Sequence, residues 1–382
     1  MTLPPRRALR VKVPSRINSL IKSFLMKIGN RFVASLFLLG LSLLLWASPA
    51  SAQDNLPPPP PAPTPKPTPY VPKDSDYDVV RVTSNLVVVP VSVTNAAGEP
   101  VLGISLKEFR LEEEGRAQEI TQLGDPEQVP LDIAILLDVS LTVDARFDFE
   151  KEAAARFIKL VMKPGDRATL FAIDTTPRLL LARETAERAA LRLLSVPPAK
   201  MATAFYDTVL DAAQYLAKNA PAQRRRVIVV ISDGEDTYSE KIKAAIGATP
   251  QERDSVRMED RLRIHQRILQ QVQREVQRAE ATFYSINPSG KALNLNVISK
   301  RAQEGMEQIS LATGGNSFVP ERVEDLDGVF RQIAAELRSQ YLLQYYSNDQ
   351  SQSTNFRRIR VTLPARTDLR VRARQGYYPK SK

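Results

Sequence analysis

The chain contains no cysteine and only one histidine, His265. Without cysteine it can form no disulfide, no thiolate metal site and no lipid anchor on cysteine, and it has no cysteine nucleophile. A Ser-His-Asp triad would depend on His265 alone, and metal sites that need several histidines are excluded. These absences argue against zinc enzymes and against most hydrolases.

Outside its N-terminal segment the chain has almost no excess of positive charge, although its formal net charge is +10. Eight of the 53 basic residues lie in residues 1–53, where no acidic residue occurs, so the remaining residues carry a net charge of only +2. This distribution gives no reason to expect a nucleic acid as partner. The length of 382 residues and the hydrophobic fraction of 43% allow about two domains with sizeable cores.

An uncharged, apolar run at residues 32–50 follows the basic segment, and the small residues Ala50, Ser51 and Ala52 stand at its end. This order is typical of an export signal peptide, so we expect residues 1–52 to be one and to be cleaved after Ala52. The alternative is an uncleaved membrane anchor, because about 19 apolar residues can span a bilayer. In both cases the rest of the chain is exported, to the periplasm, the cell envelope or the medium.

Proline dominates residues 53–76, with ten prolines between Pro57 and Pro72. This composition favours an extended polyproline II conformation and cannot form a core. We therefore expect a linker that separates the following domains from the membrane or from a preceding segment.

Alternating patterns predict β-strands on both sides of the central region. In the segment 77–125, every second residue over 87–93 is valine, and Pro90 indicates an edge strand or a bulge. The segment 341–382 contains two alternating stretches, each with an apolar and a basic face, which predict a hairpin around residues 364–368. We expect these N- and C-terminal strands to build one small all-β domain.

The central region, residues 130–340, alternates between strand and helix patterns. The runs at 131–137 and 227–231 are continuously apolar, as in strands that are buried on both faces of a parallel sheet. This pattern predicts an α/β fold with a doubly wound, mostly parallel sheet. A long insertion at 239–280 contains a helix with one apolar face. His265 lies there and is expected on the surface, with a partner-binding role for this helix as the alternative.

Hydroxyl and carboxylate side chains follow the buried strands of the central region. Asp138, Ser140 and Thr142 come at the end of the first strand, and Asp233 follows the second; Thr203 precedes a predicted helix between them. The carboxyl ends of the strands line the ligand crevice in an open α/β sheet, so three loops would bring oxygen ligands to one edge. Hard divalent cations, Mg²⁺ above all, prefer such ligands.

The ordered set resembles the metal-ion-dependent adhesion site of von Willebrand factor type A (VWFA) domains, and more narrowly that of exported bacterial VWFA proteins with flanking β segments. The family's Asp-x-Ser-x-Ser element corresponds to residues 138–142, its distant threonine to Thr203, and its third element to residues 232–234. Thr142 stands where the family has a second serine, and residues 201–202 are Met-Ala where it usually has two glycines.

This resemblance implies a VWFA/Rossmann-like fold and a site for one divalent cation. The implied cation is Mg²⁺, with Mn²⁺ or Ca²⁺ as alternatives, and an open coordination position would accept a carboxylate of a partner protein. The residues implied as metal ligands are Asp138, Ser140, Thr142, Thr203 and Asp233.

The function expected from this reading is that of an exported protein-binding or adhesion module, not of an enzyme. One alternative is a structural component of the envelope whose basic strands bind anionic surfaces. The protein would then associate with the membrane or the envelope in addition to any protein partner. The other is a Mg²⁺-dependent hydrolase or phosphotransferase. This alternative lacks a positioned base, since His265 is remote in sequence from the three loops, and no phosphate-binding glycine motif is present.

Overall fold

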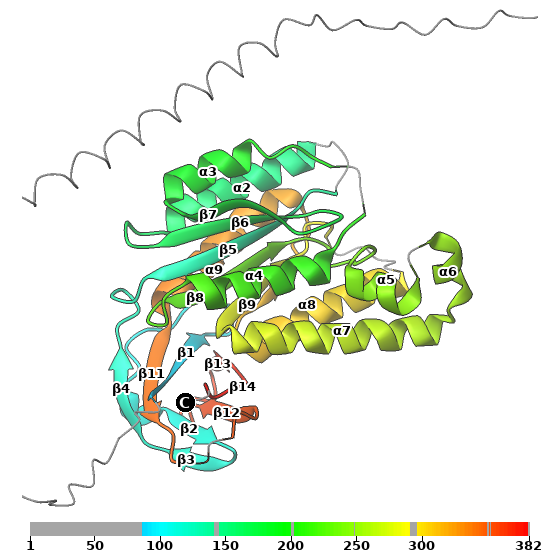
Figure 1. Ribbon diagram of the computed structural model, residues 1–382. Coiled ribbons are helices and arrows are strands. Elements are labelled where there is room, and N and C mark those ends of the chain that lie inside the picture. Colours follow the sequence, from blue (N-terminus) through cyan, green and yellow to red (C-terminus); the bar gives the residue numbers. More distant parts are fainter. Residues whose placement is uncertain are drawn as a thin grey trace, which may run out of the picture. The chain divides into compact units, whose positions relative to one another are not determined.

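The continuous apolar runs of the sequence form the centre of a six-stranded sheet in the computed structural model of the protein (Figure 1). The strand order is β10-β9-β8-β5-β6-β7, and neighbours pair in parallel except β7, which is antiparallel to β6. All residues of β5 are buried, as expected for a strand that is covered on both faces. The strands are β5 (Leu131–Asp138), β6 (Arg167–Ile173), β7 (Arg178–Glu184), β8 (Arg225–Ile231), β9 (Ala281–Ile286) and β10 (Ser317–Phe318).

The structure describes residues 86–140, 145–199, 202–247, 249–290, 296–349, 351 and 353–380. The signal peptide or anchor expected at 1–52 and the linker expected at 53–76 lie outside the described residues. No helix within the described ranges is long and apolar enough to cross a membrane.

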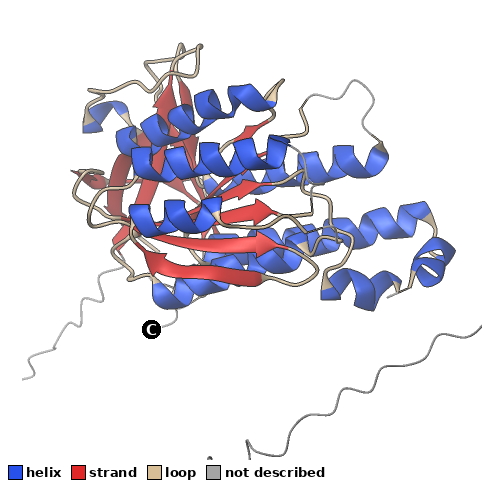
Figure 2. Ribbon diagram, turned by 90° about the horizontal axis from the view of Figure 1, so that it is seen from above, coloured by secondary structure: helices blue, strands red, loops and turns tan. Residues whose placement is uncertain are grey.

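Helices cover both faces of the six-stranded sheet (Figure 2). Because side chains of a strand alternate between its faces, Ile133 and Ile135 of β5 enter the core beneath α2, α3 and α9, whereas Ala134 and Leu136 enter the core beneath α4, α5, α7 and α8. The doubly wound, mostly parallel sheet is therefore confirmed. The helices are α2 (Ala145–Val161), α3 (Ala186–Leu194), α4 (Phe205–Asn219), α5 (Glu240–Ile246), α6 (Pro250–Ser255), α7 (Met258–Arg278), α8 (Val297–Thr313) and α9 (Leu326–Ser339), with short 3₁₀ turns η1 (Leu106–Glu108) and η2 (Val323–Asp325).

Two four-stranded antiparallel sheets share a second core and form a β-sandwich. Their orders are β13-β1-β11-β4 and β14-β12-β2-β3. The alternate valines of β1 are buried in the shared core, together with Leu111, Leu343 and Ile359 from three other strands. The strands are β1 (Leu86–Thr94), β2 (Arg110–Glu113), β3 (Arg116–Gln118), β4 (Ile120–Gly124), β11 (Tyr341–Tyr346), β12 (Arg357–Thr362), β13 (Arg370–Ala373) and β14 (Gly376–Tyr377).

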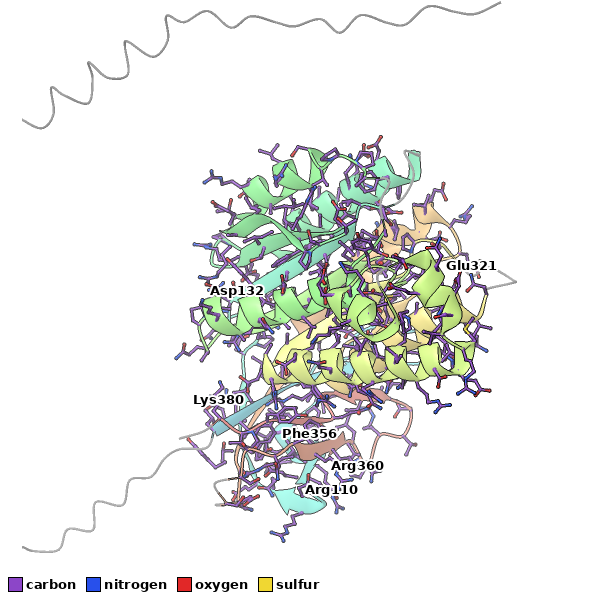
Figure 3. All side chains as sticks on the ribbon, turned by 45° about the vertical axis from the view of Figure 1, so that its right-hand side comes forward. Arg110, Asp132, Glu321, Phe356, Arg360 and Lys380 are labelled. Carbon is purple, nitrogen blue, oxygen red and sulfur yellow. The ribbon has the colours of Figure 1, made fainter. Side chains whose placement is uncertain are left out.

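The β-sandwich combines strands from both sides of the α/β region, as the sequence predicts. β1 to β4 precede that region and β11 to β14 follow it. β4 and β11 are hydrogen-bonded neighbours, so the chain leaves the sandwich from one strand and returns to the adjacent one. Arg110, Phe356 and Arg360, labelled in Figure 3, lie on this sandwich, and Asp132 lies at the start of β5 in the α/β region.

The hairpin predicted around residues 364–368 is wrong. β12 pairs with β2 and β14, whereas β13 pairs with β1 in the other sheet. The alternating pattern identifies which face of each strand is apolar, but it does not identify the neighbouring strand. Pro90 fits its prediction, because β1 pairs with β11 alone at that position and the pairing with β13 begins at Val91.

Candidate metal centre

The candidate ligands of the first and third sequence elements meet at the carboxyl edge of the six-stranded sheet. β5 and β8 are parallel neighbours, so Asp138 at the end of β5 and Ser232 after β8 lie side by side. The Ser232 hydroxyl donates a hydrogen bond to Asp138 Oδ2 at 2.6 Å. The backbone N–H and the hydroxyl of Ser140 donate to Oδ1 at 3.0 and 2.6 Å. Both oxygens of the carboxylate therefore face hydroxyl groups.

Asp138 is almost completely buried, and its electrostatic environment disfavours the charged form. Burial raises the pKa of Asp138 above its usual range, although the hydrogen bonds from Ser140 and Ser232 lower it. The charge of Asp174, at the end of β6, raises the pKa of Asp138 further. A cation bound here would stabilise the charged form of Asp138, which burial and the charge of Asp174 disfavour.

Asp233 has a similar environment. Burial raises its pKa to about 6, and the charges of Asp138 and Glu235 add to the shift. Its Oδ1 accepts a hydrogen bond from the Glu235 N–H at 3.0 Å, which fixes the carboxylate relative to its own loop. The loop turns at Gly234, where φ is +78° and a Cβ would lie 2.8 Å from the Met306 side chain, so only glycine fits without a shift.

Thr203 is held against the loop that contains Asp233. Its hydroxyl donates to the Glu235 carbonyl at 2.8 Å, and its N–H donates to Thr237 Oγ1 at 3.1 Å. Asp236 accepts a hydrogen bond from the Tyr206 N–H at 2.7 Å and thereby fixes the first turn of α4 beside Thr203. Three loops thus come together at this edge, as the sequence predicts.

Of the five predicted ligands, Asp138 and Ser140 are in direct contact, Asp233 lies on the loop after β8, and Thr203 lies before α4 and bonds that loop. Thr142 lies outside the described residues, as does the segment 200–201 that replaces the usual glycines. The structure therefore positions four of the five side chains.

Two further residues shape this edge: Ser232, which belongs to the third sequence element but was not predicted as a ligand, and Asp174, for which no role was predicted. Ser232 is fully buried against Asp138. Asp174 is buried, pairs with Arg178 at 3.2 Å and accepts the Ala204 N–H on its carbonyl at 2.8 Å. Asp174 directly follows a buried strand in the same way as Asp138, and this signal could have identified it. Asp236 is buried and holds the start of α4.

His265, expected on the surface, is only partly exposed. It is half-buried on α7, with Nδ1 at 3.5 Å from the Tyr206 hydroxyl. Burial lowers the pKa of His265, and the charge of Arg261 lowers it further. Within the described part of the chain, no hydrogen bond links His265 to a candidate metal ligand.

The donor set of this site fits a hard divalent cation. The candidate ligands are all oxygen atoms, and the charge of the buried Asp138 raises the pKa of the half-buried Asp233, so the two carboxylates are close enough to repel each other. Among the described residues, no group of three or more His, Cys, Asp or Glu side chains is placed to hold a metal ion. A cation at this edge would therefore need the hydroxyls of Ser140 and Thr203 in addition to the carboxylates.

Comparison with known proteins gives one family match. Residues 133–235, which run from the middle of β5 through the third sequence element, match the von Willebrand factor type A domain family. No curated protein sequence matches the chain.

Several solved structures are similar to part of the chain at low sequence identity. An aerotolerance-related membrane protein from Bacteroides fragilis is 17% identical over 54% of this chain and 98% of its own, with a TM-score of 0.36. The vWF domain of the type V pili tip protein Mfa5 from Porphyromonas gingivalis is 12% identical over 54% and 94%, with a TM-score of 0.35.

Proximal thread matrix protein 1 from the mussel byssus, with a zinc-occupied MIDAS motif, is 12% identical over 59% of this chain and 49% of its own, with a TM-score of 0.41. The chain thus spans about half the length of this mussel protein. The parallel sheet, the helices on both of its faces and the family match agree: the chain contains a von Willebrand factor type A domain, to which residues 133–235 belong.

Proposed function

We propose that the protein is an exported protein-binding module that engages an acidic group of its partner through a divalent cation at the carboxyl edge of the sheet. The observation that carries this proposal is the position of Asp138. Its buried carboxylate lies between the hydroxyls of Ser140 and Ser232 and close to a second raised-pKa carboxylate, that of Asp233. The matching family supports the same role.

The proposed ligands are Asp138, Ser140, Thr142, Thr203 and Asp233. Their oxygen atoms favour Mg²⁺, with Mn²⁺ or Ca²⁺ as alternatives. When bound, the cation supplies an open coordination position for a carboxylate oxygen of the partner. The chain's own contribution is to hold its oxygens in place, through the bonds from Ser232 to Asp138 and from Glu235 N–H to Asp233.

A catalytic role is not favoured by the surroundings of the site. The sole histidine, His265, contacts Tyr206, and burial keeps its pKa low. We therefore propose a binding role rather than a hydrolase or phosphotransferase that uses the same ion.

A structural envelope role based on basic strands has less support than the sequence indicated. Arg357, Arg372 and Arg374 each pair with a carboxylate inside the structure. Their charges are therefore unavailable for an anionic surface. Arg358 and Arg360 are exposed on β12 and Arg370 on β13, but Arg358 pairs with Glu114 at 3.5 Å, which leaves a small charge for binding a membrane or a polysaccharide.

Export is part of the proposal. It rests on residues 1–52 as a signal peptide or anchor and on the proline-rich linker at 53–76. We propose that the domains behind the linker are a β-rich segment at 77–125, a VWFA domain at 130–340 and the C-terminal strands at 341–382. The periplasm, the cell envelope or the medium is then the place where the partner is met.

The proposal is tested by affinity capture from an envelope extract in Mg²⁺, repeated in chelator. Proteins retained by the wild type should be released by the chelator and absent with Asp138→Ala. The matched control is Asp211→Ala on the exposed side of α4, which should retain them. Amidation of the carboxyl groups in the extract should also prevent capture, because it removes the acidic group of the partner. Capture that persists in chelator but fails in high salt would instead support the basic strands.

A further inference from the structure

A cavity of about 310 Å³ lies between α7, α8 and the segment 234–236, and none of the five candidate metal ligands lines it. α7 and α8 pack side by side (Figure 1). At Gly305 a Cβ would lie only 3.1 Å from the methyl groups of Leu269, so the two helices are in close contact there. Nearer to their N-termini the cavity opens. Its volume is in the range of small-molecule sites.

The walls of the cavity are largely apolar. Leu262 and Leu269 of α7 face Ile298 and Ala302 of α8 across it. At the edge of the cavity, Met258 is 48% exposed and Ile298 is 38% exposed. Apolar side chains of this size at a cavity edge favour an apolar occupant.

Three arginines also line the cavity, and they differ in their partners. Arg263 pairs with Asp260 at 3.5 Å, and Arg301 pairs with Glu304 at 3.1 Å. Arg261 makes no ion pair within the part of the chain that the structure describes. A half-buried guanidinium that faces an apolar cavity without a counter-ion favours an anionic ligand, and its planar fork matches a carboxylate.

Each of the two acids at the cavity is engaged by hydrogen bonds of its own. The carboxylate of Glu235 accepts a hydrogen bond from the Ser299 hydroxyl at the start of α8. The carboxylate of Asp236 accepts bonds from the Tyr206 N–H at 2.7 Å and from Ser239. Arg261 is therefore the charged side chain of the described lining that has neither an ion pair nor a hydrogen bond of this kind.

Two neutral polar groups complete the lining. The Tyr206 hydroxyl and His265 Nδ1 are 3.5 Å apart, a long contact that leaves both atoms able to bond a ligand. Burial raises the pKa of Tyr206 and lowers the pKa of His265, so both side chains are uncharged at neutral pH. An apolar cavity with a few convergent polar groups is the usual form of a small-molecule site.

We propose that this cavity binds a small apolar carboxylate, with its hydrocarbon part against Leu262, Leu269 and Ile298 and its carboxylate on the Arg261 guanidinium. None of the five proposed metal ligands lines the cavity, although Gly234 and Glu235 of the lining directly follow Asp233 in the chain.

The test is a calorimetric titration of the purified full chain with hexanoate, octanoate and 3-phenylpropionate at millimolar concentration, all in chelator. At least one acid should bind, and the matching neutral amide should bind about tenfold more weakly or worse. Arg261→Gln should reduce the affinity for the acid to that for the amide. Arg267→Gln, an exposed arginine of the same helix that does not line the cavity, is the matched control and should leave the affinity unchanged.

Ala302→Leu should weaken acid and amide alike, because the added side chain occupies the apolar part of the cavity. Asp138→Ala should bind the acid as the wild type does, so a failed metal centre and a failed cavity are distinguishable. Equal affinities of acid and amide, an unaltered affinity in Arg261→Gln, or no binding of any of the three acids would each overturn the proposal.

Discussion

The Ser232 hydroxyl donates a 2.6 Å hydrogen bond to Asp138 and so joins the ends of two neighbouring parallel strands. This bond fixes one oxygen of a buried carboxylate, and Ser140 fixes the other. The chain itself therefore holds both oxygens of the Asp138 carboxylate in place.

Mg²⁺ should stabilise the folded protein measurably. A millimolar ion at a site with a dissociation constant of about 100 μM contributes about 1.4 kcal/mol, which raises the melting temperature by a few degrees. Asp138→Ala removes a ligand and part of the repulsion with Asp233, so it should abolish the response without unfolding the protein. Scanning calorimetry with and without Mg²⁺ measures this, and Asp211→Ala should respond as the wild type does. A wild type that responds to none of Mg²⁺, Mn²⁺ and Ca²⁺ contradicts the metal site.

The hydroxyl of Thr142 should matter more than its methyl group. Thr142→Ser keeps the oxygen ligand and should keep the Mg²⁺ affinity, whereas Thr142→Val has nearly the same shape without the oxygen and should lose it. Titration calorimetry compares the two variants directly. Equal Mg²⁺ affinities of the serine and valine variants would exclude Thr142 as a ligand.

The β-sandwich should depend on Arg357, whose charge pairs with the buried carboxylate of Glu113 at 3.4 Å. Arg357→Ala leaves that carboxylate without its cation and should reduce the free energy of unfolding by about 3 kcal/mol. Arg358, the next residue of β12, is exposed, and Arg358→Ala should have little effect. Urea unfolding of the two variants measures the difference. A similar urea midpoint for both variants would show that the hydroxyl groups bonded to Glu113 stabilise its carboxylate without Arg357.

Acid should weaken the contact between Glu280 and the C-terminal segment. Burial raises the pKa of Glu280, but the charges of Arg374, Lys380 and Arg226 outweigh it, and the pKa lies below its usual 4.5. A lowered pKa in the folded state means that the stabilisation is fully present above 4.5 and is lost as the pH falls through the folded value.

Glu280→Gln should therefore cost about 1 kcal/mol at neutral pH and progressively less as the pH falls below 4.5, because the wild type loses the same charge. Stability measured across this range, with the exposed Glu307→Gln as control, checks the sign. A difference between wild type and Glu280→Gln that grows towards acid pH would contradict the assignment.

Processing after Ala52 should leave a protein that begins at Gln53. Intact mass spectrometry of the protein recovered from the cell envelope measures this. A full-length mass would identify residues 1–52 as a retained anchor.

The local patterns of the sequence predict most of the α/β region, because burial on both faces of a strand requires an unbroken apolar run such as that of β5. They predict the meeting of Asp138 and Asp233 for the same reason, since parallel strands end at one edge. They do not predict Ser232 as the bonding partner of Asp138, because that contact depends on the side-chain conformations of two strands distant in sequence.

Local sequence patterns do not predict the pairing of Glu113 with Arg357 either. Each charge alone indicates an exposed position, and only the antiparallel register of β2 with β12 brings the two together in a buried site. The separation of β12 and β13 into different sheets has the same origin: it is decided by partners that lie more than two hundred residues earlier in the chain.

The pairing of β1 with β11 also determines how the protein would bear a mechanical load. Leu86 lies opposite Tyr346, and Val91 lies opposite Tyr341. A pull from the N-terminal side enters β1 at Leu86, while a pull from the α/β domain enters β11 at Tyr341, at the opposite end of the pair. The two strands are then loaded in shear, so their hydrogen bonds resist together instead of opening one after another. Tension between the linker expected at residues 53–76 and a partner held at the carboxyl edge of the sheet would therefore load the hydrogen bonds between β1 and β11 in shear.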